Sequence, residues 1–113
     1  MHELSIVLSI VEAAEEVVKR EAATRVDTIE LEIGAIAGIE MSAFEFAWKP
    51  AVRQTVLENA RCIVHNIPAL MRCSNCGCEY QATERFAPCP SCCEILNIVL
   101  KGKELTIKSL VVS

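Results

Sequence analysis

Four cysteines in two closely spaced pairs are the strongest chemical signal in the sequence. The pairs are Cys73 with Cys76 and Cys89 with Cys92, and twelve residues separate them. Each pair can supply two thiolates from one tight turn, so the four sulfurs can surround a zinc ion tetrahedrally. Because all four ligands come from the protein, no position is left for a substrate water. The spacing predicts a closed, structural zinc site, with disulfides or an iron centre as the alternatives.

Seven cysteines in 113 residues could instead form the disulfide framework of a small secreted protein. The odd count argues against this, and so do the opening residues, which lack the basic stretch, apolar stretch and cleavage site of a signal peptide. Residues 4 to 18 are apolar, but Glu12, Glu15 and Glu16 interrupt them, so no run is long enough to span a bilayer. We therefore expect a soluble, cytoplasmic protein with no membrane role.

The remaining cysteines and one histidine are weaker candidates. Cys78 and Cys93 stand beside the two pairs and could exchange into the metal site, although their spacing suits tetrahedral geometry less well. Cys62 lies in an expected strand, where it is a small buried hydrophobe. His65 lies in the same strand, and nothing beside it in sequence completes a ligand set, so we expect it to be structural or on the surface.

The N-terminus carries a second candidate metal site. The α-amine of Met1, the backbone amide nitrogen of His2 and an imidazole nitrogen of His2 can chelate one ion in fused rings once the amide is deprotonated. Such planar, nitrogen-rich sites favour Ni(II) or Cu(II) over zinc, and Glu3 or another nearby group could complete the coordination. The alternative is that His2, as a terminal residue, is frayed and has no function.

A first helix is expected directly after these residues. Apolar residues recur at spacings of three and four, and Ile6, Ile10 and Val17 widen the face that they form. Lys19 and Arg20 lie near the end of the helix, where its dipole favours positive charge. The predicted buried face consists of Leu4, Val7, Val11, Ala14 and Val18.

A second, shorter helix is expected to start at the capping box from Ser42 to Glu45. It would bury Phe44, Ala47 and Trp48, or alternatively Phe46 on the flank. Pro50 should kink or end this helix, because proline lacks the N–H that an interior helical position needs.

The strand pattern completes an α+β architecture. We expect a small sheet of about three strands packed with two helices, and a zinc-ribbon-like subdomain inserted into this core. The core would comprise residues 1–70 and 97–113, and the zinc-binding insert residues 71–96. The segments expected to be strands or apolar runs are residues 26 to 34, 62 to 67, 95 to 100 and 105 to 112.

Charge and composition narrow the function. The net charge is −4 and aromatic residues make up 4% of the chain, which disfavours a zinc-ribbon module that binds nucleic acid. No phosphate-binding loop and no arrangement of serine or cysteine with histidine indicates an enzyme. A rubredoxin-like electron carrier with iron in the same four cysteines is the other alternative, and a red colour on purification would reveal it.

The motifs taken together resemble those of the HypA/HybF family, accessory proteins for the maturation of nickel–iron hydrogenases. The resemblance rests on Met-His-Glu-Leu-Ser at the N-terminus, Glu-Ile-Gly-Ala after the first strand, Ile-Pro-Ala ahead of the first cysteine pair, and Cys-Pro-x-Cys at the second. It extends to the closing Leu-Thr-Ile-Lys-Ser-Leu-Val-Val and so covers essentially the whole chain.

This resemblance implies a nickel metallochaperone that binds Ni(II) at its N-terminus and delivers it to a hydrogenase. The nickel role would fall on Met1, His2 and Glu3, and some relatives also use an acidic residue that corresponds to Glu40. The zinc role falls on the four paired cysteines. The implied partners are a HypB-type GTPase and the hydrogenase large subunit. Whether the protein also forms a homodimer is left open by the sequence.

The chain departs from the family pattern at Cys93. The second turn in this family usually continues Cys-Pro-x-Cys-Gly, and Cys93 replaces that glycine. A residue without the conformational freedom of glycine is expected to strain the turn.

Overall fold

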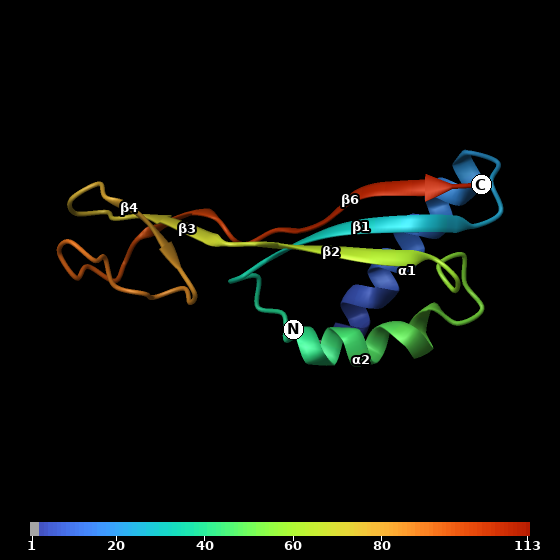
Figure 1. The fold of residues 1–113 in the computed structure, drawn as a ribbon, viewed down its shortest axis with the longest axis horizontal. Coiled ribbons are helices and arrows are strands. Elements are labelled where there is room, and N and C mark those ends of the chain that lie inside the picture. Colours follow the sequence, from blue (N-terminus) through green and yellow to red (C-terminus); the bar gives the residue numbers. More distant parts are fainter. Residues whose placement is uncertain (1–2) are drawn as a thin grey trace. The chain divides into compact units, whose positions relative to one another are not determined.

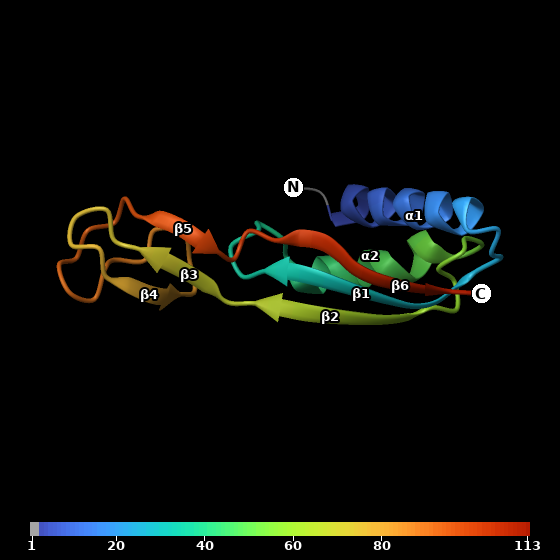
Figure 2. The same ribbon diagram turned by 90° about the horizontal axis from the view of Figure 1, so that it is seen from above.

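The computed structural model describes residues 3–113, so the predictions for Met1 and His2 lie outside the described residues. Within this range the chain forms two helices and six strands (Figures 1 and 2). In chain order these are α1 (Glu3–Arg20), β1 (Val26–Gly34), α2 (Met41–Val52), β2 (Arg61–Ile67), β3 (Ala69–Arg72), β4 (Glu79–Ala82), β5 (Ile98–Lys101) and β6 (Leu105–Val112). The predicted α+β class is confirmed.

Helix α1 buries most of the predicted face. Its buried residues are Ile6, Val7, Ile10, Val11, Ala14 and Val18. The prediction for Leu4 is wrong, because this side chain is 51% exposed. The buried face is centred on Ile10 and Ala14, which puts Leu4 at its edge. The helix also ends as predicted, with Lys19 and Arg20 in its last turn.

The main sheet has three strands in the order β2-β1-β6. Its central strand, β1, has the predicted bounds and alternates as expected, with Ile29, Leu31 and Ile33 buried between less buried residues. On β6, the hydroxyl of Ser109 donates to a carboxylate oxygen of Glu30 at 2.7 Å. The sheet therefore joins segments that are far apart in the chain.

Helix α2 begins earlier than predicted. The predicted capping box is wrong, because the N-cap is Glu40, whose Oε1 accepts from the backbone N–H of Ser42 at 3.2 Å and from its hydroxyl at 2.6 Å. Ser42 is already inside the helix. Pro50 lies within α2 rather than ending it.

The buried side of α2 is narrower than expected. Phe44 is buried, and its ring centroid lies 5.8 Å from that of Trp48. Phe46 is 84% exposed, so the alternative that placed it on the flank of the core is wrong. Two positions separate Phe46 from Phe44, which turns it well away from the buried face.

A second sheet with the order β4-β3-β5 was not expected from the sequence. Strand β3 pairs antiparallel with both neighbours, with Leu70 opposite Gln81 on β4 and Met71 opposite Val99 on β5. Met71 is fully buried. Strands of four residues give too little alternation to be recognised, and β5 uses only the end of the apolar run at residues 95 to 100.

The chain divides into two compact units. The first contains the described residues up to Leu31 together with Ile39–Val64 and Ile107–Ser113, and the second contains Glu32–Gly38 and His65–Thr106. The expected insert at residues 71–96 lies within the second unit, and its folding as a separate domain stays a prediction. Within the described residues, neither helix has the length and apolar character needed to cross a bilayer.

Candidate metal centres

The four predicted zinc ligands lie together in the second unit. The Sγ atoms of Cys73, Cys76, Cys89 and Cys92 are all within 4.8 Å of one another. Two of the separations are 3.3 Å, from Cys73 to Cys92, and 3.6 Å, from Cys76 to Cys89. Zinc with sulfur ligands at about 2.3 Å separates neighbouring sulfurs by about 3.8 Å in a tetrahedron. The cluster therefore fits a four-thiolate zinc site.

Each cysteine pair lies in a turn of the same local structure. The N–H of Gly77 donates to the Cys73 carbonyl at 3.1 Å, and the N–H of Cys93 donates to the Cys89 carbonyl at 2.8 Å. The two donors occupy the same position in their turns and share a left-handed backbone, with φ of 77° at Gly77 and 67° at Cys93. Cys93 thus adopts a conformation that favours glycine, as the sequence predicted.

Backbone N–H groups are directed at the sulfurs. Cys73 Sγ accepts from the N–H groups of Asn75 and Cys76, both at 3.4 Å, and Cys89 Sγ accepts from the N–H of Ser91 at 3.4 Å. The Cys76 N–H lowers the pKa of the Cys73 thiol, although its burial acts in the opposite direction. These donors stabilise thiolates, which is the form that binds zinc.

The other three cysteines do not join this cluster. The group of potential ligands found among the described residues contains the four paired cysteines alone. Cys62 is half-buried in β2, and burial raises the pKa of its thiol, as expected for a small hydrophobe. Cys78 Sγ donates to the carbonyl of Glu79 at 3.6 Å, and Cys93 is exposed.

The structure describes only one of the three predicted nickel ligands. Met1 and His2 lie outside the described residues, whereas Glu3 is the first residue of α1. Its Oε2 accepts from the backbone N–H of Glu40 at 3.1 Å. Glu3 and Glu40 are 37 positions apart in the chain and meet beside the N-terminus of α1. Glu40 is the acidic residue that the family resemblance indicates.

Glu40 is held in place by the start of α2. Its carbonyl accepts the first helical hydrogen bond, from the N–H of Phe44 at 2.9 Å, while its side chain caps the helix. The hydroxyl of Ser42, and then its N–H, lower the pKa of the Glu40 carboxyl, while the neighbouring Glu3 charge acts in the opposite direction. Glu40 therefore presents its backbone N–H to Glu3 and a carboxylate whose ionised form is stabilised by Ser42.

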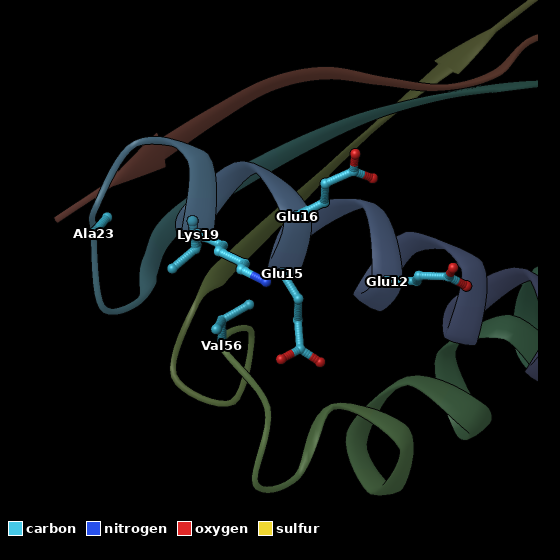
Figure 3. Close-up of a pocket in the computed structure, with 7 residues that line it drawn as sticks. Glu12, Glu15, Glu16, Lys19, Ala23 and Val56 are labelled. Carbon is cyan, nitrogen blue, oxygen red and sulfur yellow. The ribbon is translucent and has the colours of Figure 1, made fainter.

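An open groove along α1 is separate from both sites. Glu12, Glu15, Glu16 and Lys19 of α1 line it together with Val56 (Figure 3). It contains no cysteine and no histidine, and its acidic side chains form no group of three potential ligands in the part of the chain that the structure describes. We assign it no role.

These features define a class: a small α+β metalloprotein with a four-thiolate zinc site built on two turns. A model of the family described as "Hydrogenase/urease nickel incorporation, metallochaperone, hypA" matches residues 1–112. The hydrogenase maturation factor HypA of Parabacteroides distasonis is 45% identical over 112 residues, which cover 99% of this chain and 97% of that protein. The factor of the same name from Geobacter metallireducens is 38% identical over 110 residues, or 97% of each chain.

Solved structures agree on the fold. The nickel metallochaperone HypA from Helicobacter pylori is similar with a TM-score of 0.69 and 23% identity, over 99% of this chain and 97% of that one. A second solution structure of a HypA protein gives a TM-score of 0.68 at 22% identity, over 100% of this chain and 97% of that one. The chain belongs to the HypA family.

Proposed function

We propose that this protein binds Ni(II) through the Met1 amine, His2 and Glu3 and delivers it during the maturation of a nickel–iron hydrogenase. The family is one of metallochaperones for nickel incorporation, and the relatives named above are hydrogenase maturation factors. The zinc site is structural, because four cysteines leave no open position for a reacting ligand. The protein acts by ligand exchange and is not an enzyme.

The observation that carries this proposal is the contact between Glu3 and Glu40. The carboxylate of Glu3, which follows His2 directly in the sequence, accepts from the N–H of Glu40 at 3.1 Å, and this supports Glu3 as a further oxygen ligand of the terminal chelate. Glu40 lies next to it and can contribute a second oxygen. The affinity for nickel has to be moderate, because a cargo must be released to its acceptor.

The partners follow from the family. We propose that a HypB-type GTPase assists loading or delivery, that the hydrogenase large subunit accepts the nickel, and that this takes place in the cytoplasm. The protein is expected to work without nucleic acid and without a membrane. Self-association as a homodimer is compatible with this role and is not required by it.

The proposal is tested in cells that lack this protein. Hydrogenase activity should fall, and a large excess of nickel in the medium should restore it, because mass action can replace a delivery factor but not a catalyst or a structural subunit. A His2→Ala variant should fail to complement at low nickel, whereas Cys62→Ser should complement fully. Complementation by His2→Ala at low nickel would contradict the proposal.

A further inference from the structure

The two turns that hold the zinc ligands are tied together by one amide side chain. Asn97 Oδ1 accepts from the backbone N–H of Ser74, in the first turn, at 3.1 Å. Asn97 Nδ2 donates to the carbonyl of Glu94, directly after the second turn, at 2.6 Å, and also to the hydroxyl of Tyr80. The Asn97 amide therefore links both metal-binding turns and strand β4.

Two further hydrogen bonds strengthen this link. The hydroxyl of Ser74 donates to the carbonyl of Leu96 at 2.6 Å, and the hydroxyl of Tyr80 donates to the carbonyl of Ala87 at 2.8 Å. Asn97 is half-buried, and water competes less with its part-buried bonds to Glu94 and Tyr80 than with its exposed bond to Ser74. We call Ser74, Tyr80 and Asn97 the clamp.

The clamp resists one particular movement. In a tetrahedral site the two pairs of sulfurs lie in perpendicular planes, whereas in the square-planar arrangement that Ni(II) favours they share one plane. Conversion from one to the other rotates one cysteine pair by about 90° relative to its partner, given these two geometries. Because Asn97 is bonded to both turns at once, that rotation breaks at least one of its hydrogen bonds.

We propose that Asn97 is a metal-selectivity residue, which keeps nickel out of the four-cysteine site by holding the two turns in the arrangement for zinc. This inference rests on the proposed function, since a protein that carries nickel exposes its own thiolates to that ion. Asn97 is a positioning residue and not a ligand. It acts by making the geometry that nickel prefers costly.

The test is a competition experiment on the zinc-loaded, full-length protein. Zinc-loaded wild type and Asn97→Ala are incubated with excess Ni(II) under reducing conditions. Released zinc is followed with a colorimetric chelator, and nickel–thiolate charge-transfer absorption is recorded in parallel. We expect Asn97→Ala to exchange zinc for nickel at least about tenfold more readily than wild type, within the usual range for residues that orient metal ligands.

Matched variants separate selectivity from general loosening. Asn75→Ala makes the same chemical change at an exposed position in the first turn and keeps the backbone N–H to Cys73 Sγ, so it should behave as wild type. Asn97→Asp keeps the acceptor for Ser74 but places a carboxylate oxygen against the Glu94 carbonyl, so it should exchange zinc for nickel at least as readily as Asn97→Ala. If Asn97→Ala fails to fold, Tyr80→Phe removes one partner of the clamp without a cavity and should show a smaller shift in the same direction.

Two results overturn the inference. One is an Asn97→Ala protein that retains zinc against nickel as wild type does. The other is zinc release from this variant without nickel–thiolate absorption, since Asn97 would then retain zinc without selecting between metals. A failure of the proposed N-terminal nickel site can be distinguished from a failure of this inference. The N-terminal site contains no thiolate, so its loss lowers the amount of bound nickel and leaves the nickel–thiolate absorption band unchanged.

Discussion

At the scale of single residues, Cys93 is the position at which the second cysteine turn differs from the first. The equivalent residue of the first turn is Gly77, and both have a left-handed backbone. A side chain in this conformation costs about 1 to 2 kcal/mol, whereas glycine adopts it readily. The cost falls on the second of the two turns that must bind metal.

Replacement of Cys93 by glycine should therefore stabilise the protein. The removed strain exceeds the extra freedom that glycine has in the unfolded chain, so we expect a gain of about 0.5 to 1 kcal/mol in the free energy of unfolding. Urea denaturation of the zinc-loaded protein under reducing conditions measures it. Gly77→Ala is the reverse control and should destabilise, although a Cβ there meets nothing within 4 Å. Loss of zinc from Cys93→Gly would show that Cys93 is a ligand.

The ligand assignment makes its own prediction. Cys73→Ser and Cys89→Ser should lose the zinc, because each removes a buried thiolate from the cluster. Cys62→Ser and Cys78→Ser should each retain one zinc per chain. Metal analysis of the purified variants decides this, and zinc loss from Cys78→Ser with retention in Cys76→Ser would reverse the assignment in the first turn.

At the scale of elements, sequence patterns succeeded where an element is long and has one buried face. The 18 residues of α1 and the nine of β1 were predicted almost to their ends. Strands β3 and β4 were missed, because four residues carry too little periodicity and pairing with a distant strand decides their conformation. The role of Asn97 was also missed, because its partner Ser74 is 23 positions away and no local sequence pattern links the two residues.

The start of α2 shows a different limit. Ser42 and Glu45 have the spacing of a capping box, yet Glu40 caps the helix and Ser42 donates to it. Both patterns are compatible with the local sequence, and the contact between Glu40 and Glu3 favours the earlier start. A residue that the family resemblance indicated as a further nickel ligand is thus also the N-cap of α2.

Glu40 gives a prediction about pH. The hydroxyl and N–H of Ser42 lower the pKa of this carboxyl below its ordinary value of 4.5, so the ionised form stabilises the folded state. That contribution is complete above the ordinary pKa and disappears as the pH falls through the lower, folded value. Wild type should therefore melt at a higher temperature than Glu40→Gln near neutral pH, and the gap should close in acid. Fluorescence of Trp48 in α2 reports it, and a gap that widens toward low pH would contradict the account.

At the scale of the whole molecule, the two units differ in what stabilises them. Most of the buried apolar side chains belong to the first unit, including those of α1, Phe44 and Leu57. The second unit buries fewer, namely Ile33, Ala69, Met71 and two of the zinc ligands. A unit with so small a core depends on its metal for stability.

Removal of zinc should therefore affect the units unequally. The only tryptophan, Trp48, lies in the first unit and the only tyrosine, Tyr80, in the second. When a strong chelator removes zinc under reducing conditions, we expect the NMR signals of Tyr80 to lose their dispersion and those of Trp48 to keep it. Equal loss at both rings would show that zinc stabilises the whole chain.

The central claim is that nickel is bound by the terminal amine together with His2 and Glu3. The most direct test is nickel titration of the zinc-loaded protein with its native N-terminus against the same protein extended by glycine and serine. The extension converts the Met1 amine into an amide and leaves the His2 and Glu3 side chains and the zinc site unchanged. Loss of this donor should weaken nickel binding by at least about 1.4 kcal/mol, or tenfold. Equal affinity of the two proteins would contradict the terminal-amine site.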